Sequence, residues 1–213
     1  MTRFFALSSA FVAPLAILGS PALASGYTEP VVEIAPMPIA APVAIWTGAY
    51  AGLSYSRHGS GEMTFANPPT GTFSFIEGSD FGAFGGYTRQ YGTWVFGGEL
   101  AYYNIDQRVT GFATAGLDDM FDLSGRIGHA WGNFQLYGVA GLSMGTYFEM
   151  GGASQWSLGG YHVGLGAEYQ VSRRFTVGLQ YVTRRFSGDN PDGLGQTVSI
   201  EHDTVSLRGM FRF

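Results

Sequence analysis

The stretch Val205-Ser206-Leu207-Arg208-Gly209-Met210-Phe211-Arg212-Phe213, at the end of the chain, decides the fold. Every odd position is apolar or glycine, whereas the even positions hold Ser, Arg, Met and Arg. This period of two predicts a β-strand with one hydrophobic face and one charged face. Arg208 and Arg212 do not suit the core of a water-soluble sandwich. They suit a transmembrane barrel strand, whose outer face meets lipid and whose inner face is polar.

The start of the chain has the features of an export signal. Arg3 supplies a positive charge, Phe4–Leu18 form an apolar stretch, and Ala22-Leu23-Ala24 is a small-x-small cleavage signal. The apolar stretch is too short, and too interrupted by Pro14, for a good membrane-spanning helix. We therefore predict a signal peptide over residues 1–24. No cysteine is present, which excludes a lipid-anchored lipoprotein and a disulfide framework.

Residues 25–45 are rich in Pro and Ala. Repeated proline removes backbone donors and favours extended polyproline II structure, so we predict a flexible periplasmic leader here. The remaining residues, 46–213, form the predicted barrel domain.

The composition favours a membrane barrel over a secreted β-sandwich. Charged residues make up only 13% of the chain, with 33 glycines and 15% aromatic residues, whereas soluble domains average about 25% charged residues. No later segment approaches the ~20 consecutive apolar residues that a membrane helix needs. The formal net charge of −5 gives no reason to expect a nucleic-acid partner.

From Trp46 onward the chain breaks into segments that alternate between apolar and polar residues. The sequence therefore predicts an all-β fold, an eight-stranded antiparallel up-and-down transmembrane β-barrel. The expected strands cover residues 46–56, 80–88, 93–103, 119–128, 134–147, 158–169, 174–186 and 205–213.

The connections between these segments alternate in length. Short turns follow the second, fourth and sixth strands, and long loops are expected at about 57–79, 104–118, 148–157 and 187–200. Outer-membrane barrels have short periplasmic turns and longer external loops. We therefore expect an outer-membrane location with both barrel termini on the periplasmic side.

If the apolar face meets lipid, the opposite face lists the residues of the barrel interior. An eight-stranded barrel is just wide enough to be filled by side chains, and unpaired buried charges are costly. We expect Glu99 and Arg126 at similar depth on adjacent strands, Arg208 near them, and Glu168 with Arg212 lower. The predicted ion-pair network consists of Glu99, Asp122, Arg126, Glu168, Arg184, Arg208 and Arg212.

Two functional interpretations of these charges stay open. The first is structural: the pairs fill and close the lumen. The second is a narrow passive channel for ions or small solutes. Aromatic residues near the strand ends predict the two interfacial girdles of a barrel. The expected periplasmic girdle is Trp46, Tyr91, Trp131, Phe175 and Phe213, and the expected external girdle is Tyr55, Tyr103, Tyr147, Trp156 and Phe186.

Several short motifs carry a family resemblance over about residues 46–213. They are Trp46-Thr47-Gly48-Ala49-Tyr50-Ala51-Gly52, Gly85-Gly86-Tyr87, Gly97-Gly98-Glu99, Arg126-Ile127-Gly128 and the Phe213 ending. In their order and spacing the chain resembles the small eight-stranded outer-membrane barrels of alphaproteobacteria, the OmpA-like and opacity-protein group, often labelled porin. The resemblance implies a surface protein of Gram-negative bacteria with structural or adhesive roles. It also implies that the terminal strand, with Phe211 and Phe213, is an assembly signal for the barrel-assembly machinery.

Catalysis and metal binding are weaker interpretations. His58 and His202 fall near the external rim, with Ser56, Ser199 and Glu201 nearby in sequence, but the His-x-Ser-Asn motif of barrel deacylases is absent. No two histidines share a ligand spacing. We expect no catalytic residue, no metal and no cofactor. The expected partners are outer-membrane lipid and lipopolysaccharide, with the protein a monomer.

Overall fold

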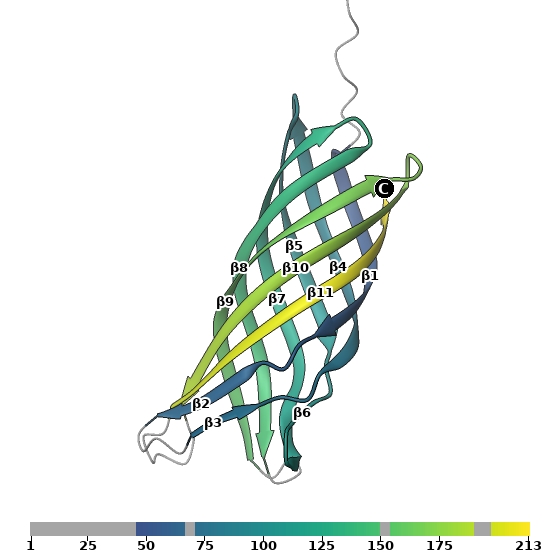
Figure 1. Cartoon of the computed structure of the whole chain (residues 1–213). Coiled ribbons are helices and arrows are strands. Elements are labelled where there is room, and N and C mark those ends of the chain that lie inside the picture. The colour runs from purple at the N-terminus through teal and green to yellow at the C-terminus, as the bar shows by residue number, and fades with distance from the viewer. Residues whose placement is uncertain (1–45, 67–70, 150–153, 190–196) are drawn as a thin grey trace, which may run out of the picture. The chain divides into compact units, whose positions relative to one another are not determined.

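The computed structural model describes residues 46–66, 71–149, 154–189 and 197–213, which are almost entirely β-strand (Figure 1). The predicted signal peptide and leader lie outside the described residues. In the part of the chain described, no helix is long and apolar enough to cross a membrane. The strands are β1 (Gly48–His58), β2 (Glu62–Ala66), β3 (Gly71–Ser74), β4 (Gly78–Tyr91), β5 (Trp94–Asn104), β6 (Gln107–Val109), β7 (Phe112–Trp131), β8 (Phe134–Glu149), β9 (Ser154–Gln170), β10 (Phe175–Asp189) and β11 (Thr197–Arg212).

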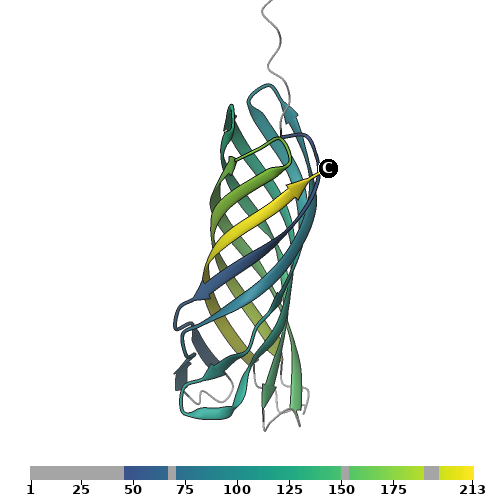
Figure 2. The same cartoon turned by 90° about the vertical axis from the view of Figure 1, so that its right-hand side faces the viewer.

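Eight long strands close into a barrel. The antiparallel order is β1-β4-β5-β7-β8-β9-β10-β11, and a further pairing of β1 with β11 completes the ring (Figures 1 and 2). Tyr50 opposes Arg212 and His58 opposes Thr204 along that closing ladder. Closure leaves no exposed strand edge in the ring. The predicted all-β, eight-stranded antiparallel fold is therefore confirmed.

One end of the barrel, which we call the turn end, holds the tight connections and Phe213. The β4–β5 and β7–β8 hairpins each turn through two residues, with Gly92 and Gly132 at φ of +61° and +59°. Glycine enters this left-handed region without steric cost, so these tight hairpins form where the sequence predicts them.

The opposite end, which we call the extended end, differs from the prediction of long loops. Residues 57–79 contain β2 and β3, residues 104–118 contain β6 and the start of β7, and residues 187–200 contain the start of β11. β2 pairs with β11, β3 with β2, and β6 with β7. A Phe75–Val109 bridge joins the β3 side to the β6 side. The wall therefore continues as paired strands well beyond the predicted strand ends.

The outer surface carries an apolar belt next to the turn end. Its residues project outward at alternate positions, for example Leu53, Phe81, Leu123, Leu165 and Leu207. Toward the extended end the outward residues become polar.

Strand β11 shows this change of polarity within one strand. Val205, Leu207 and Phe211 point outward and Arg208 inward, whereas further toward the extended end Glu201 points outward and Ile200 inward. An apolar exterior suits lipid and a polar exterior suits water. The inversion therefore marks the edge of the belt that is nearer to the extended end.

Candidate functional site: the barrel interior

Inward-facing residues of β11 give the order of the layers inside the barrel. From the turn end they are Arg212, Met210, Arg208, Ser206, Thr204, His202, Ile200 and Val198. The layers around them change from charged to apolar along this line. Among the described residues, four carboxylates and four arginines are buried: Asp80, Glu99, Asp122 and Glu168 with Arg126, Arg184, Arg208 and Arg212.

Glu99 on β5 is the centre of the main charged layer. Its Oε2 accepts hydrogen bonds from Arg208 Nη2 at 2.6 Å, from the Tyr50 hydroxyl at 2.8 Å and from Arg126 Nη1 at 3.3 Å. Arg208 reaches Glu99 from β11, on the far side of β1 and β4. One carboxylate therefore ties three other strands together through the interior.

Arg126 on β7 extends this layer to a second carboxylate. Its Nη2 donates to Glu168 Oε1 on β9 at 2.7 Å. Its guanidinium carbon lies 3.9 Å from the centre of the Tyr137 ring. The pairing of Arg126 with two carboxylates and an aromatic face offsets the cost of burying its charge.

Asp122 on β7 organises the next layer toward the extended end. Arg184 on β10 donates to Asp122 Oδ2 from Nε at 3.0 Å and from Nη2 at 2.7 Å. Ser143 donates to Asp122 Oδ1 at 2.6 Å, and His162 lies between the Ser143 and Ser124 hydroxyls at 2.8 Å from each. Both charged layers are therefore cross-strand networks of side chains, 95% or more buried at their charged members.

The turn end of the interior is closed by Arg212 and Trp46. Arg212 Nη1 donates to the Trp46 carbonyl at 2.9 Å and to Thr88 Oγ1 at 2.8 Å. Trp46 is fully buried, and its Nε1 donates to the Gly132 carbonyl at 2.9 Å. Glu168, which was expected at the same depth as Arg212, is bonded to Arg126.

Trp46 also corrects the expected periplasmic girdle. The outward residues of β1 are odd-numbered, so an even-numbered residue next to this strand falls on the inner side. Tyr91, Trp131, Phe175 and Phe213 do lie exposed at the turn end.

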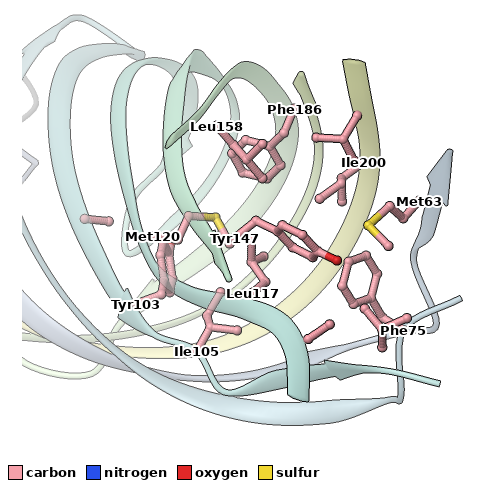
Figure 3. Packing of buried hydrophobic residues seen from close by; sticks show 14 of the residues in the cluster. Met63, Phe75, Tyr103, Ile105, Leu117, Met120, Tyr147, Leu158, Phe186 and Ile200 are labelled. Carbon is pink, nitrogen blue, oxygen red and sulfur yellow. The ribbon is translucent and has the colours of Figure 1, made fainter. Parts of the chain in front are cut away.

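An apolar cluster fills the interior at the extended end (Figure 3). Phe75, Leu117 and Tyr147 meet there, each at most 1% exposed. The residues labelled in Figure 3 come from seven strands and from the segments that connect them: Met63, Phe75, Tyr103, Ile105, Leu117, Met120, Tyr147, Leu158, Phe186 and Ile200. Close packing of such side chains leaves little room for water.

The apolar cluster corrects the expected external girdle. Tyr103, Tyr147 and Phe186 are buried inside the barrel, and only Tyr55 of the described members faces outward. The side chain of Trp156 lies outside the described residues. Applied strictly, the period of two would have placed all three aromatic residues on the inner face.

Two histidines and an aspartate lie between the charged and apolar layers. The His58 and His202 rings are 5.3 Å apart, and His58 Nε2 is 3.9 Å from Asp80 Oδ2. Burial lowers the pKa of both histidines, that of His202 well below its ordinary value, so both are neutral at neutral pH. The predicted neighbour Ser56 instead accepts a hydrogen bond from Ser206 at 3.0 Å.

The structure thus brings all seven predicted network residues into the interior. Sequence reasoning missed their neutral partners Tyr50, Ser143 and Thr204, although the inward positions of these residues in the alternating pattern were available. No group of three or more histidine or carboxylate side chains in the described ranges is placed to hold a metal ion.

Comparisons with known proteins agree with this geometry. The model of the outer membrane protein beta-barrel domain matches residues 11–213. A "22 kDa outer membrane protein" of Rhizobium leguminosarum bv. viciae is 31% identical over 175 residues, which is 78% of this chain and 77% of that protein.

Two solved structures are similar to this chain at low identity, and the first has the same fold. Neisserial surface protein A superposes with a TM-score of 0.51 at 14% identity, over 78% of this chain and 99% of the other. Ail, the attachment invasion locus protein of Yersinia pestis, gives a TM-score of 0.46 at 14% identity, over 78% and 99%.

Proposed function

The chain belongs to the outer membrane protein beta-barrel domain family, and from this premise we propose that it is a closed, non-catalytic barrel of the outer membrane that presents its extended end to the exterior. Its role is structural and surface-contacting. The observation that carries the proposal is the interior, which is crossed by ion pairs over the belt and filled by an apolar cluster above it.

Two kinds of barrier lie one after the other along the barrel axis and support a closed interior: layers of ion pairs and an apolar cluster. An ion that follows the barrel axis meets the Trp46 and Arg212 contact, then the Glu99 and Asp122 layers, and finally the apolar cluster. Fixed pairs leave few charges free to coordinate an ion, and the apolar cluster, whose polar atoms are tyrosine hydroxyls, offers little to replace its hydration shell.

The hydrogen bonds and the burial of the interior serine and histidine side chains support a non-catalytic role. Ser124 and His162 are in hydrogen-bond contact, but Ser143 stands between His162 and Asp122. All four side chains are at least 92% buried. A nucleophile needs a position next to it for a substrate carbonyl, and this packed layer provides none.

The polarity of the wall supports the proposed orientation. The extended end projects well beyond the apolar belt and has polar outward residues, which suits water outside the bilayer. The turn end projects little beyond the belt. Short turns on the periplasmic side and longer external segments are the rule in outer-membrane barrels. The extended end is then the part available to other molecules.

Two experiments test the proposal. Proteoliposomes that contain the refolded protein should not swell in an isosmotic arabinose solution, whereas a general porin at equal protein content should make them swell. Rapid swelling would favour the channel interpretation.

Orientation is tested separately with single-cysteine variants, since the chain has no cysteine. A membrane-impermeant maleimide should label Thr110→Cys on intact cells and should leave Asn133→Cys unlabelled until the cells are lysed. The reverse result would invert the proposed orientation.

A further inference from the structure

Exposed charges are segregated between the two ends of the barrel. The exposed or half-exposed Asp and Glu side chains of the described residues all lie at the extended end: Glu62, Glu77, Asp106, Asp118, Asp119, Asp189, Glu201 and Asp203. The turn end instead exposes Arg89, Arg173 and Arg174. Two arginines of the extended end have ion-pair partners, Arg108 with Asp106 and Arg185 with Glu201. No described Asp or Glu side chain lies on the outer surface of the turn end to pair with its arginines.

Arg89 has the most specific position of the three. It lies on the outward face of β4, between the exposed Tyr87 and Tyr91, and opposite Phe96 of β5. Its guanidinium carbon is 5.0 Å from the centre of the Tyr91 ring, and Tyr91 and Phe96 meet edge to face at 6.3 Å. The guanidinium of Arg89 therefore lies within the aromatic girdle of the turn end, on a surface that faces lipid.

A cation at this depth needs an anionic partner. Tyrosine and tryptophan side chains occupy the level of the lipid head groups, so the phosphate is the group nearest to Arg89. A guanidinium binds phosphate through parallel hydrogen bonds, and its contact with the Tyr91 ring leaves the N–H edge free to donate.

We propose that Arg89, with Tyr87, Tyr91 and Phe96, is a binding site for the phosphate and upper acyl chain of an anionic phospholipid. The aromatic rings contact the glycerol and acyl region, and Arg89 binds the phosphate. This inference rests on the proposed function only for the assignment of the site to the periplasmic leaflet. Lipid binding itself does not depend on whether the lumen is closed.

The test is native mass spectrometry of the folded protein in detergent with added dimyristoyl phosphatidylglycerol, and in parallel with dimyristoyl phosphatidylcholine. The variants are Arg89→Gln and Arg89→Lys, with Arg57→Gln as the control because Arg57 is an exposed arginine at the other edge of the belt. Heat-modifiable migration on gels verifies that each variant is folded.

One arginine near an anionic lipid surface contributes about 1 kcal/mol, which is about a five-fold change in affinity. We expect wild type to bind phosphatidylglycerol more tightly than phosphatidylcholine, Arg89→Gln to lose about five-fold for phosphatidylglycerol alone, and Arg89→Lys to lose less. Arg57→Gln should bind as wild type does. Equal binding of the two lipids, or equal losses in Arg89→Gln and Arg57→Gln, would overturn the site. A conducting barrel that still shows the Arg89 effect would overturn the closed lumen and leave this site intact.

Discussion

Arg208 Nη2 lies 2.6 Å from Glu99 Oε2, although the two residues are 109 positions apart and their strands are separated by β1 and β4. The bond crosses the interior rather than following the wall. It ties the last strand of the barrel to its third long strand, so the closing β1–β11 ladder is supported from inside.

Replacement of Glu99 by glutamine should therefore strongly destabilise the barrel. The variant keeps a hydrogen-bond acceptor at position 99 but removes the carboxylate that pairs with Arg208, and it leaves Arg126 with Glu168 as its carboxylate partner. Breaking a buried pair by removing one partner costs about 3–5 kcal/mol. Urea unfolding in lipid vesicles measures this loss. Glu62→Gln, an exposed position on β2, is the control and should change the free energy of unfolding by less than about 0.5 kcal/mol. Equal stabilities of the two variants would contradict the Glu99 hub.

Adjacent arginines on β10 provide a matched comparison of a buried and an exposed ion pair. Arg184 pairs with Asp122 inside, where both side chains are at most 4% exposed, whereas Arg185 pairs with Glu201 outside at 59% and 62% exposure. Double-mutant cycles with Arg→Met and Asp→Asn or Glu→Gln changes should give a coupling energy of about 2–3 kcal/mol for the inner pair. The outer pair should give about 0–1 kcal/mol. Similar coupling energies would show that the interior is hydrated like the surface.

The polarity inversion along β11 predicts that an outward-facing arginine destabilises the barrel at one position of this strand and is tolerated at another. Leu207→Arg places a charge on the lipid-facing belt and should cost about 2–4 kcal/mol. Ser199→Arg is on the same outward face but above the belt, and should change stability by no more than about 0.5 kcal/mol. Unfolding in vesicles of matched thickness checks both values. A large cost at Ser199 would mean that the belt extends further than the outward residues indicate.

The lowered pKa of His202 predicts a loss of stability in acid. His202 lies beyond the belt toward the extended end, is fully buried, and faces the cation Arg184 and the second histidine His58. The native state holds the neutral ring, so it loses stability as the pH falls below the unfolded-state pKa of about 6.5.

The size of this effect follows from the linkage relation. Each pH unit between the unfolded-state pKa and the lower native pKa costs about 1.36 kcal/mol of stability. His202→Gln should therefore lose less stability than wild type between pH 8 and pH 5. Parallel pH profiles of the two proteins would contradict a neutral buried His202.

Much of this architecture could be predicted from the alternation of residues. The parity of β11 identifies Arg208 and Arg212 as interior residues, and the depth of Glu99 and Arg126 on neighbouring strands predicts their contact. The bond between Arg208 and Glu99 could not be predicted, because it depends on how far the strands shift relative to one another when the barrel closes.

The extended end was mistaken for loops for a physical reason. Met63 and Phe65 alternate with polar residues as strand residues do, but there the apolar face points inward and the polar face outward. A strand prediction that requires an apolar outward face does not recognise the strands that lie beyond the membrane. The same change explains why Tyr147 and Phe186 pack in the interior instead of forming a girdle.

The measurement that tests the closed interior most directly is planar-bilayer recording of the purified, refolded wild-type protein. We expect a steady baseline without defined conductance steps, because ion pairs and the apolar cluster obstruct the barrel axis in series. Reproducible steps of uniform size, altered in Glu99→Gln, would show that ions pass the Glu99 layer and would contradict a closed interior.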